Sequence, residues 1–210
     1  MYKRQAISEL TITRRFPKDG VVLLAEEEGD TLFIIVKGKV KVTSLAEDGR
    51  EVIFSILKEG DFFGEMALLD GKPRSATVIA TEDTELLLLR RPDFTRLLEG
   101  SPQLAIKMLA ELAGRLRKAD RQIESLALLD VHGRVVRTLL QLAEEQGVTT
   151  EGGIEIANRP THQDLAHMCG TTRETVSRII RELQRNGYVR LEGRKITILD
   201  EKRLRDDFAY

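Results

Sequence analysis

The sequence predicts an α+β fold in three parts: a jelly-roll-like β-roll over residues 1–100, a long helix over 101–130 and a winged helix-turn-helix over 131–210. Three observations support this order. Turn residues recur about every ten positions in the first part, and apolar residues recur every three or four positions in the second. In the third part, two short helical patterns separated by a glycine-containing turn precede a hairpin pattern.

Short strand-like runs lie between the turns of the first part. In Val36–Val42 lysine alternates with glycine or valine, the period of two that turns one face of a strand toward a core. Glu51–Leu57, Ala76–Thr81 and Glu85–Leu89 are rich in β-branched or large apolar residues. Several short strands at this spacing predict a sandwich, a roll or a barrel, of which we favour the roll.

The period changes after Ser101-Pro102, where serine can cap a helix and proline can fill its first position. The apolar residues that follow recur at intervals of three and four: Leu109, Leu112, Leu116, Ala119, Ile123 and Leu126. This seam favours a parallel two-stranded coiled coil, and hence a homodimer, over a helix packed on its own domain. Asp130 ends the run and can cap a further helix, roughly Val131–Glu145.

The third part contains a helix, a tight turn, a second helix and a hairpin. Thr161 with Asp164 predicts the start of a helix that ends near Cys169-Gly170. Thr171 or Thr172 opens the second helix, and its apolar face comprises Val176, Ile179, Ile180 and Leu183. Two strands are expected around a glycine turn: Tyr188–Leu191 and Lys195–Leu199.

The composition excludes several classes of protein. The chain has 210 residues, 41% hydrophobic and 32% charged, with a formal net charge of -1. This composition excludes a disordered or collagen-like chain. Because the net charge is close to zero, a polyanionic partner would have to bind to a local basic patch. The apolar runs are far shorter than the roughly 18 residues of a membrane span, no signal peptide is evident, and Cys169 has no cysteine to pair with. We expect a cytoplasmic protein without membrane contact.

A local basic patch lies between Arg159 and Lys195, where eight basic residues outnumber four acids. Arg173, Glu174 and Arg178 fall at the start of the second helix, where a recognition helix reaches base edges in the major groove of DNA. Arginine presents a fork to guanine, and glutamate accepts from the cytosine amino group. The candidate DNA contacts are Thr172, Arg173, Glu174, Thr175, Arg178 and Lys195.

A structural interpretation of the same helix stays open. Thr171 and Glu174 are three residues apart, the spacing of a capping box in which Glu174 would only stabilise the helix end. Arg181 and Arg185 could likewise be solvated helix charges.

A second motif spans Phe63–Val78, with the sequence FGEMALLDGKPRSATV. It resembles the phosphate-binding cassette of cyclic-nucleotide-binding domains. A cyclic phosphate needs a cation, hydroxyl or amide donors and close backbone approach, which arginine, serine and glycine supply. The candidate nucleotide contacts are Gly64, Glu65, Met66, Ala67, Arg74, Ser75 and Ala76, joined by Ala119 and Asp120 on the long helix. The alternative is a pair between Glu65 and Arg74 in a pocket that has lost its ligand.

With both motifs, nearly the whole chain resembles the family of bacterial transcription regulators that includes the cyclic-AMP receptor protein and the fumarate-nitrate regulators (CRP/FNR). The match runs from Glu28-Gly29-Asp30 through the cassette and the Leu126–Arg134 hinge to Gly170–Arg178. The resemblance implies that Gly64 and Glu65 hold the ribose, and that Arg74 and Ser75 hold the cyclic phosphate. It also implies that Arg173, Glu174 and Arg178 read a two-fold DNA site with TGTGA-like half-sites.

The chain departs from the family at the adenine contacts, where a threonine and a serine are replaced by Ala119 and Asp120. Cyclic AMP is the favoured ligand, and cyclic GMP and cyclic dinucleotides stay open; Asp120 either contacts the base or pairs with a nearby arginine. The first 130 residues hold no Cys or His, which excludes an iron–sulfur cluster or haem there. His132, His162 and His167 are too scattered for a zinc site, and we expect packing or surface roles for them.

We therefore expect a homodimeric transcription regulator, not an enzyme, with double-stranded DNA and RNA polymerase as partners and no covalent cofactor. One alternative is a constitutive DNA-binding regulator with an empty pocket. Another is a nucleotide-binding regulatory subunit whose winged helix serves protein contacts. The short Ala6–Leu10 stretch has no assigned role.

Overall fold

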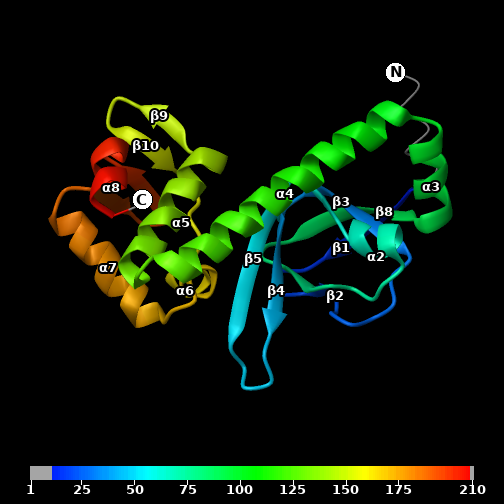
Figure 1. Ribbon diagram of the computed structural model, residues 1–210, viewed down its shortest axis with the longest axis horizontal. Coiled ribbons are helices and arrows are strands. Elements are labelled where there is room, and N and C mark those ends of the chain that lie inside the picture. The colour runs from blue at the N-terminus through cyan, green and yellow to red at the C-terminus, as the bar shows by residue number, and fades with distance from the viewer. Residues whose placement is uncertain (1–10, 209–210) are drawn as a thin grey trace. The chain divides into compact units, whose positions relative to one another are not determined.

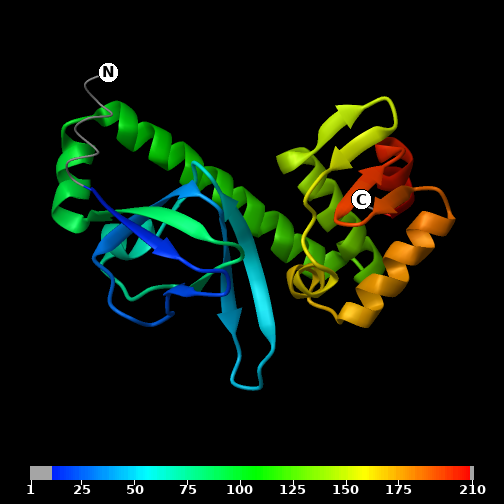
Figure 2. The same ribbon diagram turned by 180° about the vertical axis from the view of Figure 1, so that it is seen from behind.

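The computed structural model describes residues 11–208, and Ala6–Leu10 therefore lies outside the described residues. The chain divides into two compact units, with the boundary between Arg115 and Leu116. The first unit is mainly β-structure, and the second packs helices around a small sheet (Figures 1 and 2). None of the helices within residues 11–208 is both long and apolar enough to cross a membrane.

The first unit is built on two four-stranded antiparallel sheets, with strand orders β1-β8-β3-β6 and β2-β7-β4-β5. The strands are β1 Thr11–Phe16, β2 Val21–Leu23, β3 Thr31–Lys37, β4 Lys39–Leu45, β5 Glu51–Lys58, β6 Phe62–Phe63, β7 Thr77–Ala80 and β8 Thr84–Arg90. Inward side chains of both sheets, among them Ile35, Val40 and Leu86, form one core. The predicted N-terminal β-roll domain is confirmed.

The prediction of one strand over Val36–Val42 is wrong, because Gly38 separates β3 from β4. Gly38 has φ of 95°, which favours glycine, and a Cβ there would lie 2.5 Å from Thr84 Oγ1. The alternation of side chains belongs to β4 alone, where Val40 is fully buried.

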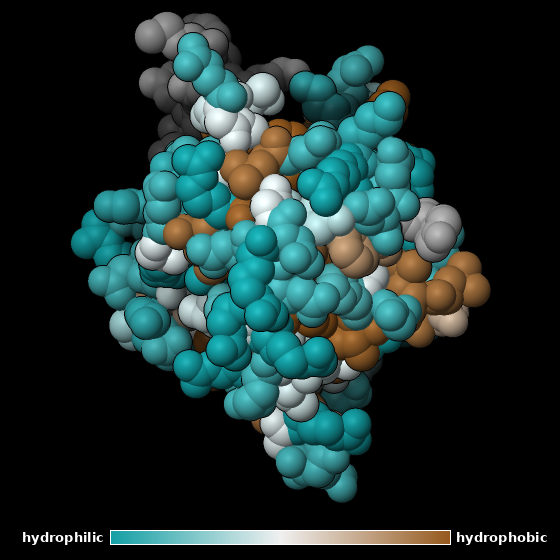
Figure 3. Space-filling view, turned by 90° about the vertical axis from the view of Figure 1, so that its left-hand side faces the viewer, coloured by the Kyte–Doolittle hydropathy of each residue, from teal (hydrophilic) through white to brown (hydrophobic). Residues whose placement is uncertain are grey.

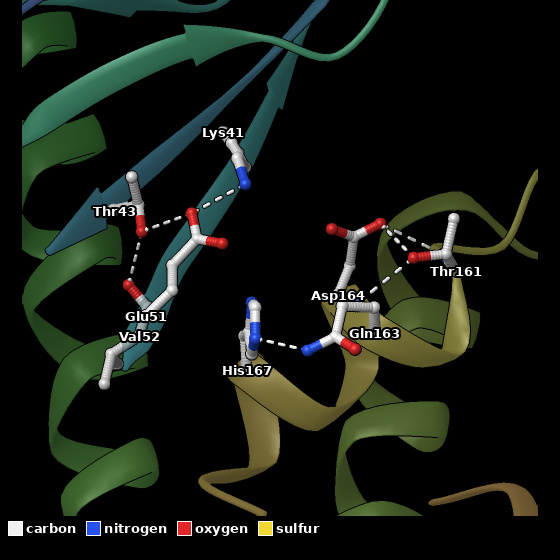
Figure 4. A network of polar contacts seen from close by, with 8 residues as sticks. All are labelled: Lys41, Thr43, Glu51, Val52, Thr161, Gln163, Asp164 and His167. Carbon is white, nitrogen blue, oxygen red and sulfur yellow. Dashed lines mark hydrogen bonds and ion pairs between the residues drawn. The ribbon is translucent and has the colours of Figure 1, made fainter. Parts of the chain in front are cut away.

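The β4–β5 hairpin carries a polar network next to its bulge at Val42 and Thr43. Glu51 Oε1 accepts from Lys41 Nζ at 2.6 Å and from Thr43 Oγ1 at 2.8 Å (Figure 4). These contacts join the two strands through side chains as well as backbone.

Within the described residues, three helices accompany the first unit: α2 Glu65–Asp70, α3 Arg91–Glu99 and the start of α4 Pro102–Leu128. α3 was not anticipated; Pro92 lies in its first turn, and Phe94 packs with Leu68 and Met108 in a second small core. α4 begins at Pro102, as the Ser101-Pro102 pair predicts.

The second unit holds α5 Val131–Gln146, α6 His162–Cys169, α7 Arg173–Arg185 and α8 Glu201–Phe208, with the strands β9 Val148–Thr150, β10 Gly153–Ile156, β11 Val189–Glu192 and β12 Lys195–Ile198. The sheet order is β11-β12-β10-β9. Asp130 caps α5 by accepting from Gly133 N at 2.8 Å. Thr161 and Asp164 form the predicted capping box at α6 (Figure 4). The winged helix-turn-helix is confirmed.

Cys169 and His132 both serve packing in the second unit. The Cys169 thiol is buried, and burial raises its pKa to about 11, so it stays protonated at neutral pH. The His132 ring stacks on Phe208 with a centroid distance of 4.5 Å. This stack anchors the end of α8 against the first turn of α5.

Candidate nucleotide and DNA sites

Two glycines make room for one guanidinium in the first unit. Gly64, with φ of 81°, immediately precedes α2, and a Cβ there would lie 2.7 Å from Arg74 Nη1. A Cβ on Gly29 would lie 2.2 Å from Arg74 Nε. A side chain at either position would therefore displace the Arg74 guanidinium from its present place.

Arg74 is 6% exposed and is held by backbone carbonyls. Its Nη1 donates to Gly64 O at 2.8 Å, and its Nη2 donates to Thr31 O at 2.9 Å. Burial lowers the pKa of Arg74, partly offset by the charge of Asp30. Within residues 11–208 no carboxylate forms an ion pair with Arg74. A buried cation whose acceptors are neutral favours an anionic ligand.

Glu65 pairs with Arg115, so the alternative of a Glu65–Arg74 pair is wrong. Glu65 is 4% exposed, and its Oε1 accepts from Arg115 Nη1 at 3.1 Å. Arg115 also donates to Phe62 O at 2.7 Å and lies over the Phe62 ring at 4.6 Å. Arg115 lies outside the apolar seam of α4, and this position is the one signal in the sequence that its side chain faces elsewhere.

Arg91 is a second arginine that sequence reasoning missed. Its Nη1 donates to Leu68 O at 2.9 Å, while its Nη2 donates to Ala67 O at 2.9 Å and to Gly29 O at 3.0 Å. It therefore ties the C-terminal end of α2 to the turn that approaches Arg74. Nothing in the local sequence indicates these contacts.

The other predicted nucleotide contacts fall into two groups. Ala67 and Ala76 are buried, whereas Met66 and Ser75 are exposed and touch, with Ser75 Oγ 3.5 Å from Met66 Sδ. The structure thus gathers the cassette residues Gly64, Glu65, Met66, Ala67, Arg74, Ser75 and Ala76 around α2 and the loop before β7. Ala119 and Asp120 are exposed on the part of α4 that belongs to the second unit.

Thr172, and not Thr171, caps α7. Its side chain accepts from Thr175 N at 3.3 Å, which makes Thr175, and not Glu174, the third residue of the helix. The capping-box interpretation of Glu174 is therefore wrong. Arg173 and Glu174 occupy the first two helical positions and are exposed, as is Arg178. The opposite face of α7, including Val176 and Leu183, is buried in the core.

The exposed arginines of α7 contrast with Lys195 in the wing. Arg173, Arg178 and Arg185 form no ion pair within the described part of the chain. Lys195 Nζ lies 3.0 Å from Glu155 and 3.2 Å from Glu192, and these contacts raise its pKa. A surface hollow on α7 is lined by Arg178, Arg181, Gln184 and Arg185. Figure 3, which views the molecule from the left-hand side of Figure 1, shows a surface that is mostly hydrophilic.

The α4 seam is largely uncovered. The exposed fractions of Leu109, Leu116, Ile123 and Leu126 are 65%, 64%, 66% and 52%. Ala119 is exposed as well, and Leu112 packs against the second core of the first unit. The interpretation of α4 as a helix that buries its seam on its own domain is therefore wrong for most of its length.

Both units match known domain families. Residues 13–101 match the cyclic nucleotide-binding domain, and residues 133–207 match the Crp-like helix-turn-helix domain. A CRP-like cAMP-activated global transcriptional regulator of Mycobacterium tuberculosis is 33% identical over 189 residues, which covers 90% of this chain and 84% of that protein. The chain belongs to the CRP/FNR family.

Solved CRP/FNR structures agree with this assignment. A CRP/FNR-family transcriptional regulator from Thermus thermophilus is 31% identical, with a TM-score of 0.73 over 94% of this chain and 98% of that one. The c-di-GMP responsive global regulator CLP from Xanthomonas campestris is 25% identical, with a TM-score of 0.78 over 95% of this chain and 99% of that one. Members of the family are transcription regulators and not enzymes. This chain is accordingly a DNA-binding transcription regulator with a cyclic nucleotide-binding domain.

Proposed function

We propose that the protein is a homodimer whose binding to a TGTGA-like palindrome is controlled by cyclic AMP bound at the cassette. The observation that carries the proposal is Arg74: a buried guanidinium, packed against two glycines, whose hydrogen-bond partners are carbonyls. A cyclic phosphate supplies the counter-charge for this cation, with which no carboxylate of the described residues forms an ion pair. Ser75 and the amide of Ala76 are the neighbouring donors.

The number of cations favours a mononucleotide. Arg74 serves one phosphate, whereas a cyclic dinucleotide carries two. Arg91 carries a second guanidinium, but it makes three hydrogen bonds to carbonyls, against two for Arg74, and so has fewer N–H groups left for a phosphate. The Mycobacterium tuberculosis relative is described as cAMP-activated, and the Xanthomonas campestris relative as c-di-GMP responsive. We expect Asp120 to discriminate the base, with cyclic GMP as the competing ligand.

The exposed seam of α4 supports the homodimer, because a second copy would cover its leucine and isoleucine side chains. We expect Leu116→Asp to produce monomers at concentrations where the unchanged protein is dimeric, since it places a charge in the seam. Sedimentation velocity measures this. Lys107→Asp, which lies off the seam on the same helix, is the matched control, and equal dissociation of both variants would contradict the seam assignment.

The DNA contacts that we propose are Thr172, Arg173, Glu174, Thr175, Arg178 and Lys195, with one α7 in each half-site. The nucleotide would act through the hinge near Leu128–Asp130 by binding the DNA-competent state more tightly. RNA polymerase is the further partner that we propose for a regulator of this family.

The deciding experiment is fluorescence anisotropy of a labelled TGTGA-N6-TCACA duplex at fixed salt, with and without cyclic AMP and against a scrambled duplex. Tight, specific binding only with cyclic AMP supports the proposal. Equal specific binding in both conditions indicates a constitutive regulator or another nucleotide, and cyclic GMP and cyclic dinucleotides then decide between these. Absence of salt-sensitive DNA binding would instead favour a subunit that acts through protein contacts.

A further inference from the structure

The first residue of α6, His162, is fixed against α7. Its ring Nδ1 lies 2.8 Å from Ser177 Oγ. Arg181 Nε donates to the carbonyl of Ser177 at 3.0 Å. Because Arg173, Ser177 and Arg181 are four residues apart, they share one face of α7, the face that meets His162.

The charges that act on His162 are positive. Burial lowers its pKa, and Arg159, Arg173 and Arg181 lower it further. Arg159 lies in the loop before α6, and its own pKa is lowered by burial and by Arg194 of the wing. Three elements, namely the loop before α6, α7 and the wing, thus bring cations together around one imidazole.

No carboxylate of residues 11–208 forms an ion pair with this group. Asp164, the acid nearest to His162 in the sequence, accepts from Thr161 Oγ1 at 2.6 Å at the helix cap (Figure 4). Arg159 Nε and His162 Nε2 are buried and have no hydrogen-bond partner within the described part of the chain. Clustered cations without a counter-ion destabilise a fold, so their presence points to an anionic partner.

We propose that Arg159, Arg173 and Arg181 form a contact site for one phosphate of the DNA backbone, and that the neighbouring His162 takes up a proton when this phosphate binds. The inference rests on the proposed DNA surface of α7. The group includes Arg173, a proposed base contact, and in helix-turn-helix proteins the first helix of the motif crosses the backbone. A duplex read by α7 therefore brings a phosphate to this group.

The uptake of a proton by His162 follows from the negative charge that the bound phosphate brings next to it. In the free protein burial and the surrounding arginines disfavour the charged form of His162. A bound phosphate offsets these charges and favours the imidazolium, so the pKa of His162 is higher in the complex than in the free protein. DNA affinity then rises as the pH falls through the higher of the two values, by at most about tenfold per pH unit for each protomer.

The test measures the dissociation constant of the TGTGA-N6-TCACA duplex from about pH 5.5 to about pH 8 at fixed salt, the range in which histidines titrate. The full-length protein is used, with and without cyclic AMP, so that nucleotide control and proton linkage are tested separately. We expect affinity to increase toward low pH for the unchanged protein and for the control His167→Gln. His162→Gln should remove this dependence. Titration calorimetry in Tris and in phosphate buffer should show fewer protons taken up by His162→Gln.

His162→Lys guards against a folding defect of the glutamine variant, because it carries a permanent positive charge. It should bind DNA at high pH as tightly as the unchanged protein does at low pH. An unaltered pH dependence in His162→Gln, with equal proton uptake, would overturn the inference and leave the proposed function intact. Loss of salt-sensitive DNA binding at every pH in the unchanged protein would overturn both.

Discussion

The cassette of the first unit and the start of α7 in the second unit use arginine in opposite ways. In the first unit Arg74, Arg91 and Arg115 are largely buried, and each donates to backbone carbonyls. In the second unit Arg173 and Arg178 are exposed at the start of α7, without ion pairs in the described part of the chain. A small anion is bound by a few donors that are already fixed in position, whereas a long polyanion is bound by many exposed, mobile charged side chains.

The largest effect is expected from Arg74→Ala. We expect cyclic nucleotide affinity to fall by about a hundredfold or more, roughly 3 kcal/mol, because a cationic donor to the phosphate is lost. Isothermal titration calorimetry measures this, with Arg96→Ala on the exposed side of α3 as the control. Unchanged nucleotide affinity in Arg74→Ala would remove Arg74 from the phosphate site.

Arg115→Met tests whether the first unit depends on its buried charges for stability. It leaves the Glu65 carboxylate buried without its partner, which should lower the free energy of unfolding by about 2–4 kcal/mol. Urea unfolding measures the loss. Adding Glu65→Gln should restore part of it, because the unpaired charge is removed. No difference between the single and the double variant would contradict a coupled pair.

Glu174→Ala and Arg178→Ala address the second unit. Each should relax the preference among half-sites by about 1–3 kcal/mol with little change in stability, because both side chains are exposed. Competition anisotropy with single-base variants of the duplex measures the preference. An unaltered preference in both variants would mean that neither side chain reads bases.

The smallest effect is expected from Lys195→Ala, because Glu155 and Glu192 already neutralise this lysine. It should weaken binding to all sequences alike, and it should reduce the salt slope by less than the value of about 0.9 expected for the loss of one full phosphate contact. A larger loss from Lys195→Ala would show that DNA displaces the two carboxylates.

Features set by neighbouring residues could be predicted from the sequence, and contacts between distant residues could not. The Thr161–Asp164 cap and the buried face of α7 follow from spacings of three and four. Arg115 reaches Glu65 across 50 residues, which no local pattern encodes. α8 could not be predicted from an apolar pattern, because six of its eight residues, EKRLRDDF, are charged and a single side chain, Leu204, is buried.

The break at Gly38 shows a second reason why part of the fold could not be predicted from the sequence. A glycine within an alternating run is compatible with a continuous strand or with a turn. The approach of Thr84, which belongs to another strand, decides between them. The alternatives for Glu174 could not be separated either, because Thr171 and Thr172 are equally good caps until the helix start is known.

The cap at Thr172 bears on how regulators of this kind change their targets. Thr172 caps the start of α7. The proposed base-reading residues Arg173, Glu174 and Arg178 are therefore not needed to cap the helix. They are free to vary by mutation while the core on the other face of α7 stays intact. The repertoire of DNA sites can therefore diverge among descendants, or be redesigned in a library of these three positions, without renewed selection for folding.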